Sequence, residues 1–159
     1  MDVIVKPDRA EFRIKDAAKL VLLKDLVIAV LNALPDTPIL SFGINHGVIS
    51  TLGNLKDYYA FGKYLNPLDI WQDTFKDPRL KFLSIIDDKP EWIFQKTLMI
   101  QPSKYENVEY CVDINMNYHS QMPESTQKSL LAAQRIAEHF EACLDDYEVV
   151  VKNLMDKLV

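Results

Sequence analysis

The sequence predicts an α+β fold in two layers: an antiparallel sheet of about five strands, with a long buried N-terminal helix and a long C-terminal helix packed against it. Three observations support this prediction. Residues 17–34 form the most apolar segment of the chain. Residues 108–119 alternate apolar and polar side chains, which is typical of a half-buried antiparallel strand. Residues 130–158 repeat apolar side chains at steps of three and four without Gly or Pro, as a long amphipathic helix does.

Length and composition favour one folded domain. The chain has 159 residues, and two separate pieces would each be too small to bury a good core, so we expect a single domain over residues 1–159. Hydrophobic residues make up 48% and charged residues 26%, the balance of a globular protein. The net charge of −5 opposes binding to nucleic acid, because such binding requires Lys and Arg to neutralise phosphates.

The sequence also favours a cytoplasmic protein. Its two cysteines, Cys111 and Cys143, are too few for a disulfide framework. The first residues lack the basic region and the apolar run of a signal peptide. Lys19, Lys24 and Asp25 interrupt the apolar segment, and charges in hydrocarbon are costly, so we expect a buried helix there and no membrane partner.

The first part of the chain predicts strands on either side of a helix. Residues 3–14 are extended in character and are broken by Pro7, which indicates one interrupted strand or two short strands. Residues 15–33 are helical, with polar residues spread around the helix, so much of its circumference should be covered. Pro35 ends this helix, and residues 39–50 follow as a strand.

The middle of the chain predicts two short helices and then a meander. Residues 54–65 form a short helix, and Asn66 is expected to cap a second helix that runs to about residue 75. A short strand at 80–86 should lead through a turn into a strand at 91–101. One face of that strand carries apolar residues with one exception, Lys96; these are Trp92, Phe94, Leu98 and Ile100.

A loop at residues 102–107 and the alternating strand at 108–119 are expected next, and everything after Pro123 is predicted to be helical. Over residues 130–158 a continuous helix would be about 44 Å long, at about 1.5 Å per residue. A compact domain of this size has a diameter of about 39 Å, so the helix should span it or project beyond it. Its apolar stripe must be shielded by the protein's own sheet, with or without a bend near Asp145, or by a second copy.

We expect self-association through the distal half of this stripe, because three-four spacing favours helix pairing. The predicted interface residues are Phe140, Leu144, Tyr147, Val151, Leu154 and Leu158.

The best candidate for a ligand site is the polar face of the strand at 108–119. Its side chains repeat at intervals of about 6.6 Å, two residues of strand rise. They could bind a small polar ligand or, together with Cys111, a metal, although a solvated outer face explains the same pattern. Catalysis would require an imidazole on this face to meet His46 or a carboxylate from another strand. The candidate ligand residues are Asp113, Asn115, Asn117 and His119, with His46.

Familiar catalytic and cofactor motifs are absent from the sequence. It contains no glycine-rich phosphate loop, Cys-x-x-Cys, His-Glu-x-x-His or Gly-x-Ser-x-Gly, and we expect no cofactor, no resident metal and no catalytic residue. A group of aromatic residues could line a groove, but their helical spacing is more typical of core packing; these are Tyr58, Tyr59, Phe61, Tyr64, Trp71 and Phe75.

The segment Leu34–Asn45 resembles one found in uncharacterised bacterial proteins, in which an apolar helix ends in a Pro-rich turn before a Gly-Ile-Asn strand. That resemblance implies no activity. The chain is also similar to the export chaperone SecB in its size, acidity, antiparallel strands and terminal helices, although the long helix between the first two strands departs from the order of elements in SecB.

Taken together, these features predict a non-enzymatic binding or assembly protein, with a second copy or another protein as its partner. One alternative is a small enzyme or a metabolite or metal binder that uses the polar strand face. The other is a chaperone-like or antitoxin-like partner binder with an exposed apolar groove.

Overall fold

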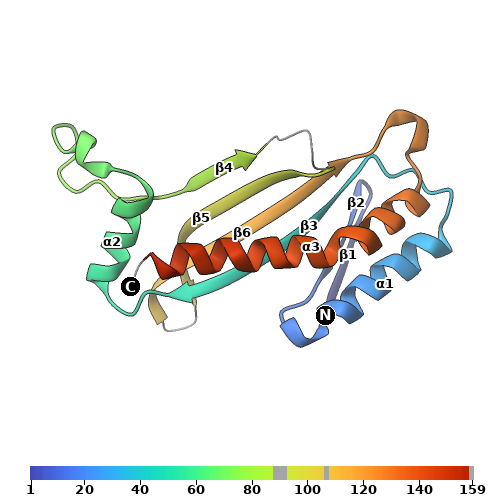
Figure 1. Ribbon diagram of the computed structural model, residues 1–159, viewed down its shortest axis with the longest axis horizontal. Coiled ribbons are helices and arrows are strands. Elements are labelled where there is room, and N and C mark those ends of the chain that lie inside the picture. The colour runs from blue at the N-terminus through green and yellow to red at the C-terminus, as the bar shows by residue number, and fades with distance from the viewer. Residues whose placement is uncertain (88–92, 106–107, 158–159) are drawn as a thin grey trace. The chain divides into compact units, whose positions relative to one another are not determined.

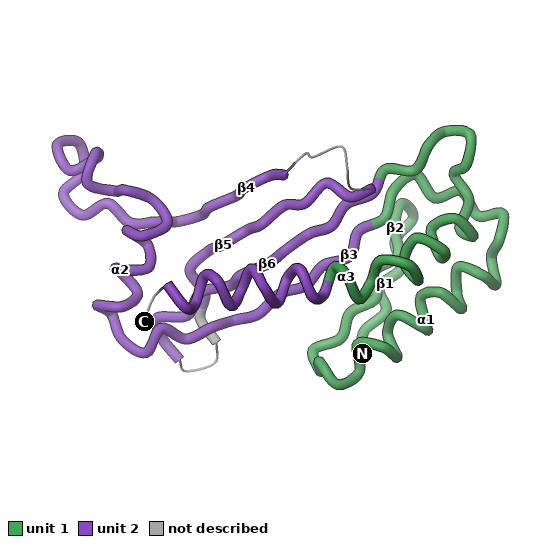
Figure 2. The backbone as a smooth tube through the Cα atoms, viewed as in Figure 1, with its two compact units in different colours: residues 1–42, 121–143 green, residues 43–120, 144–159 purple. Residues whose placement is uncertain are grey.

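The computed structural model of the protein describes residues 1–87, 93–105 and 108–157. Three α-helices and antiparallel sheets make up the fold, which confirms the predicted α+β class. The chain divides into two compact units, each built from two segments (Figure 2). The first contains residues 1–42 and 121–143, and the second contains residues 43–120 and 144–159.

The first unit begins with a β-hairpin. Strands β1 (Asp2–Lys6) and β2 (Arg9–Arg13) pair antiparallel, with Asp2 opposite Arg13 and Lys6 opposite Arg9. Pro7 lies in the turn between them, where its missing N–H removes nothing from the ladder. Of the two options that the sequence left open, two short strands are therefore correct.

Helix α1 (Leu20–Ala33) follows a 3₁₀ turn at Ala17–Lys19 and ends before Pro35, as predicted. The expectation that it is buried is wrong, because none of its residues is fully buried, and Val21 and Leu22 are 59% and 57% exposed. Within its unit, only the hairpin and the first half of a later helix are available to cover it. An apolar composition therefore did not ensure burial on all sides.

The second unit contains a four-stranded antiparallel sheet in the order β3-β6-β5-β4 (Figure 1). The predicted single sheet of about five strands is thus four strands plus the separate hairpin. The strands are β3 (Ser41–Thr51), β4 (Leu83–Asp87), β5 (Gln95–Tyr105) and β6 (Val108–Gln121). Trp92 lies outside the described residues.

Strand β5 continues through residues that were predicted to be a loop. Pro102 lies opposite Val112 of β6, and a proline inside a sheet normally interrupts pairing. The partner strand on its other side, β4, begins at Leu83, which lies opposite Ile100. Pro102 therefore falls beyond β4, where its side of β5 is an edge and a missing N–H costs little.

Helix α2 (Leu55–Leu65) is confirmed, with the Asn54 side chain capping it by accepting a hydrogen bond from the Asp57 backbone at 3.0 Å. The second helix expected from Asn66 is only a 3₁₀ turn at Leu68–Trp71. Asn66 is instead the C-terminal cap of α2, because its backbone N–H bonds to the carbonyl of Gly62. The predicted start signal therefore served as a stop signal.

Helix α3 (Ser129–Asp156) is one uninterrupted helix of 28 residues, about 42 Å long at about 1.5 Å per residue. Its residues up to Cys143 belong to the first unit, where Glu141 pairs with Lys24 of α1. Its residues from Leu144 belong to the second unit. Among the described residues, no helix has both the length and the apolar character needed to cross a membrane.

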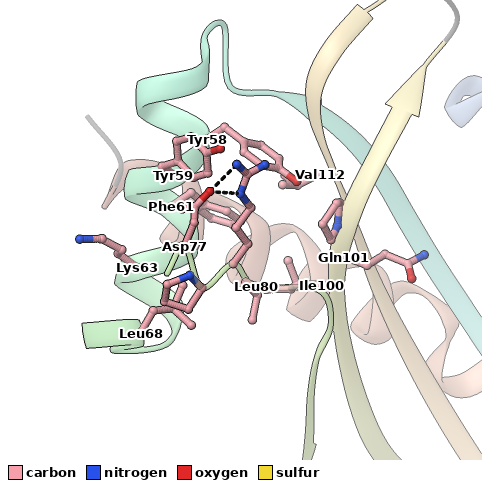
Figure 3. A pocket seen from close by; sticks show the side chains of 14 residues that line it. Tyr58, Tyr59, Phe61, Lys63, Leu68, Asp77, Leu80, Ile100, Gln101 and Val112 are labelled. Atoms are coloured by element: carbon pink, nitrogen blue, oxygen red, sulfur yellow. Dashed lines mark hydrogen bonds and ion pairs between the residues drawn. The ribbon is translucent and has the colours of Figure 1, made fainter. Parts of the chain in front are cut away.

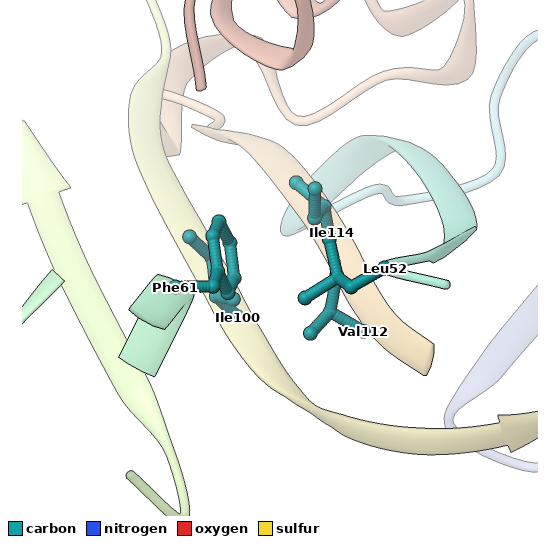
Figure 4. Close-up of a cluster of buried hydrophobic side chains, with 5 residues drawn as sticks. All are labelled: Leu52, Phe61, Ile100, Val112 and Ile114. Atoms are coloured by element: carbon teal, nitrogen blue, oxygen red, sulfur yellow. The ribbon is translucent and has the colours of Figure 1, made fainter. Parts of the chain in front are cut away.

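A hydrophobic cluster joins the sheet to two helices in the second unit (Figure 4). Phe61 of α2 lies against Ile100 of β5, and Ile114 of β6 is fully buried beside them. The end of α3 packs on the same cluster through Val151, Leu154 and Met155. Both helices therefore contact the same face of the sheet.

A polar contact fixes α3 to that apolar face. Asp146 of α3 accepts a hydrogen bond from the Tyr118 hydroxyl at 2.8 Å and pairs with the Lys96 ammonium at 2.9 Å. Lys96 is the exception in the apolar pattern of β5, and its side chain is only 17% exposed. A cation at that depth needs a partner, and α3 supplies it. We call these three side chains the Lys96 triad.

Replacing Asp146 with Asn should lower the free energy of unfolding by about 1–2 kcal/mol, because Lys96 loses its counter-charge in a partly buried position. Asp145→Asn is the matched control, since Asp145 is exposed on the next position of the helix and should change stability by less than about 0.5 kcal/mol. Urea unfolding followed by circular dichroism measures both. Equal effects of the two substitutions would show that the triad does not stabilise the fold.

Candidate functional site

The polar residues predicted on β6 lie together on the sheet face opposite α3. Asp113, Asn115, Asn117 and His119 alternate with the buried residues of β6 and are partly exposed. Asp113 accepts a hydrogen bond from the Gln101 side chain of β5 at 3.2 Å. The face is thus a row of side chains along a strand, which bond sideways to their neighbours instead of converging on one point.

Glycines of β3 make room for the asparagines of β6. The Asn117 amide donates to the Asn45 side chain at 2.6 Å. A Cβ atom at Gly43 would lie 3.2 Å from the Asn117 amide nitrogen, and one at Gly47 would lie 3.0 Å from that of Asn115. The asparagine amides therefore lie close to the glycine backbone, where any larger residue would crowd them.

Cys111 was expected on this polar face, but it is not part of it. Its side chain is 1% exposed, and its thiol contacts the carbonyl oxygens of Val108 and Glu109 at 3.6 and 3.8 Å. The irregularity is at Tyr110, whose φ of 60° breaks the alternation just before Cys111. In the part of the chain that the structure describes, no group of three or more His, Cys, Asp or Glu side chains is arranged to hold a metal ion.

His46 lies on the other face of the sheet from the β6 residues with which it was grouped. It is 6% exposed, and its ring stacks on Tyr147 of α3 at 5.6 Å and meets Tyr118 edge-on at 6.3 Å. Burial lowers the pKa of His46, so the neutral imidazole is the folded form. The structure therefore separates His46 from His119 by the thickness of the sheet.

The apolar stripe of α3 is used within the chain. Phe140 and Tyr147 are 7% and 8% exposed, and Val151 and Leu154 pack on the hydrophobic cluster. Tyr147 also donates its hydroxyl to the Ile114 carbonyl at 3.2 Å, and burial raises the pKa of this phenol. Leu144 is partly buried and Leu158 lies outside the described residues. The described stripe residues need no second copy to shield them.

A cavity of about 280 Å³ lies between α2, the segment before β4 and the start of the β5–β6 ladder (Figure 3). We call it the α2 cavity. Its floor is apolar and comes from the hydrophobic cluster, with Phe61 and Ile100 each 1% exposed and Val112 3% exposed. Leu68 and Leu80 complete the apolar lining. A pocket with an apolar floor and few polar groups is typical of small-molecule sites.

The wall of the α2 cavity carries charged and aromatic groups. Arg79 donates from Nε and Nη2 to one carboxylate oxygen of Asp77, at 2.9 and 2.5 Å (Figure 3). Its guanidinium carbon lies 4.8 Å from the centre of the Tyr59 ring, a cation–π contact. The hydrogen bonds that Arg79 donates to the Asp77 carboxylate raise the pKa of Arg79, so this wall stays cationic. Tyr58 and Lys63 also line the cavity.

A second hollow of about 400 Å³ adjoins the first and shares Tyr58 and Arg79 with it. Tyr110 lines this hollow, and its ring lies 6.0 Å from that of Tyr58. A left-handed φ at a bulky residue costs about 1–3 kcal/mol and is found mostly at functional sites. The strained backbone at Tyr110 therefore lies beside the second hollow, at the end of the sheet where the α2 cavity is also found.

The aromatic residues between positions 58 and 75 divide into two groups. Tyr58, Tyr59 and Phe61 line the α2 cavity, as the groove option for this group required. Core packing also holds for Phe61, which is buried, and for Tyr58, which packs against the hydrophobic cluster. Tyr64, Trp71 and Phe75 are 50%, 47% and 56% exposed, and Trp71 and Phe75 pair edge-on.

In the sequence, Arg79 and Asp77 belong to a charged cluster with Lys76 and Lys81, which is typical of a solvated surface. Their approach to α2 depends on the irregular segment before β4, so the sequence did not place them at a cavity.

His46→Phe should flatten the pH dependence of stability below pH 6.5. The pKa of His46 in the folded protein is below its ordinary value, so between the two pKa values the unfolded chain binds a proton at His46 and the folded chain does not. As the pH decreases below 6.5, the free energy of unfolding therefore decreases, by up to about 1.4 kcal/mol per pH unit for this one group. Phe retains the ring stacked on Tyr147 and removes the titration. Urea midpoints from pH 7.5 to 5 measure it.

The native protein, measured over the same pH range, is the reference for the slope. A His46→Phe variant with the native slope would contradict the assigned pKa direction.

No protein-family model, curated protein or solved structure matches this chain.

Proposed function

We propose that this chain is a non-enzymatic binding protein and that its binding site is the α2 cavity. One observation carries the proposal: a preformed cavity of about 280 Å³ combines a floor of nearly fully buried apolar side chains with a wall of charged and aromatic groups. An engineered apolar cavity of about 150 Å³ holds benzene, so this volume suits a ring with a short substituent.

The arrangement of the polar residues supports binding rather than catalysis. The candidate residues on β6 lie in a row along one strand, and His46 is on the opposite face. General acid–base catalysis needs two groups within hydrogen-bond reach of one reacting atom. The small-enzyme alternative therefore lacks a convergent site among the residues that the sequence nominated.

Gly62→Leu should abolish binding of small aromatic probes such as toluene and indole. Gly62 lines the cavity, and a Cβ there would meet Leu80 at 3.6 Å, an ordinary contact, so the rest of the leucine side chain enters the cavity. Ala60→Leu is the matched control, because residue 60 is exposed on the same helix and does not line the cavity. Ligand-observed NMR and thermal shift measure binding.

The native protein and Ala60→Leu should bind these probes with equal affinity. Retention of full affinity by Gly62→Leu would move the site elsewhere, and absence of binding by the native protein at millimolar probe would refute the proposed function.

A second candidate function, assembly with a second copy or with another protein, is favoured by an exposed apolar segment. Ile70, Trp71 and Phe75 are 70%, 47% and 56% exposed within six residues of chain. Aromatic side chains are enriched at protein interfaces, and monomeric proteins rarely expose them in groups. This segment, rather than the α3 stripe, is where we place such an interface.

Light scattering tests self-association directly. We expect a mass above that of the 18.3 kDa chain at high concentration and a return to the monomer mass in Trp71→Ser. Val149→Ser is the control, because Val149 is 57% exposed on α3, away from this segment in sequence. A monomer mass for the native protein at every concentration would leave another protein as the only partner for this surface.

A further inference from the structure

The α2 cavity differs in charge from the rest of the chain. The whole chain carries −5, whereas the cavity is lined by two cations, Lys63 and Arg79, and one carboxylate, Asp77. Lys63 pairs at 3.3 Å with Asp69, which does not line the cavity, and both side chains are mostly exposed, so this pair is weak. A single negative charge on an occupant would therefore balance the lining.

The Arg79 side chain is also mostly exposed, at 57%, but unlike Lys63 it is oriented by two hydrogen bonds and a ring contact. Asp77 fixes one edge of the guanidinium through Nε and Nη2, and the Tyr59 ring lies under its face. A guanidinium has five N–H donors, and these two bonds use only two of them. Arg79 can therefore bridge Asp77 and a second carboxylate without releasing the first.

The apolar floor sets the rest of the ligand. Phe61, Ile100 and Val112 present only carbon to the cavity, and the Tyr58 ring stands at its wall (Figure 3). Charged or hydroxylated groups on this floor would lose their hydration without gaining a partner. An aromatic or branched apolar body fits there, with any polar group at the Arg79 end.

From this placement, and resting on the proposed function, we propose that the α2 cavity binds a small monocarboxylate with an apolar body, of the arylalkanoate class. The ring lies on the floor formed by Phe61 and Ile100, and the carboxylate accepts hydrogen bonds from Arg79. Asp77 positions the guanidinium, and its negative charge repels a second carboxylate bound beside it. The site is thus selective for the anion over a neutral analogue of the same shape.

Calorimetric titration with 3-phenylpropanoate and with 3-phenylpropan-1-ol tests this selectivity. The two probes share the ring and the chain and differ in the charged end. The native protein should bind the acid about tenfold more tightly than the alcohol, since charge-assisted hydrogen bonds exceed neutral ones. Arg79→Gln should reduce the affinity for the acid to that for the alcohol and leave the alcohol unchanged.

Two further variants exclude indirect effects. Lys81→Gln removes one positive charge from the same segment at an exposed position that does not line the cavity, and it should leave both affinities at native values. Asp77→Asn removes the negative charge that repels the ligand carboxylate and keeps an amide oxygen that can accept from Arg79, so it should strengthen binding of the acid without affecting the alcohol. This gain of affinity cannot arise from a misfolded variant.

The outcomes separate the inference from the function on which it rests. Equal binding of acid and alcohol by the native protein, or weaker acid binding in Asp77→Asn, would overturn the carboxylate inference and leave the cavity as an apolar site. Failure of both probes to bind at millimolar concentration would overturn the binding function itself.

Discussion

The contact between the second half of α3 and the four-stranded sheet determines the rest of the second unit. An apolar stripe alone could slide along a sheet, because hydrophobic attraction has no direction. The Lys96 triad removes that freedom, since Asp146 meets Lys96 and Tyr118 at one position along the helix. Tyr147, one residue further, bonds to a strand carbonyl. Polar contacts thus set the register in an interface whose stability comes mainly from apolar burial.

Occupying one sheet face with helices leaves the two faces with different roles. The covered face holds the hydrophobic cluster, and at its α2 end the cluster also forms the floor of a cavity. The other face carries amides and a carboxylate that bond to their neighbours in the plane of the sheet. Concavity is therefore found at the apolar face, although the sequence drew attention to the polar one.

Much of the fold could be predicted because periodicity is a local property. The alternation in β6, the unbroken pattern of α3 and the Pro-rich end of α1 each depend on neighbouring residues, and each is present. The pairing of distant segments was harder to predict from the sequence. Whether Pro102 interrupts β5 depends on where β4 begins, and whether α1 is buried depends on how many elements share its unit. Neither can be obtained from one segment alone.

The site was predicted only in part for the same reason. The aromatic residues of α2 were recognised as a possible groove, and three of them line the cavity. The charged wall was not recognised, because Arg79 and Asp77 approach Tyr59 through a segment without regular structure. His46 shares the alternation of β3 with Ile44, and that pattern correctly places it among apolar neighbours. Its grouping with His119 was wrong because the two histidines lie on opposite faces of the sheet.

The close approach of β3 glycines to β6 asparagines has an evolutionary consequence. A methyl group at Gly47 would lie 3.0 Å from the side-chain amide nitrogen of Asn115, so a larger residue there requires the Asn115 side chain to shift by a few tenths of an ångström. If Asn115 first became a smaller residue, that shift would not be needed. Substitutions at the two positions are therefore more easily accepted in one order than in the other, which gives the divergence of this surface a preferred direction.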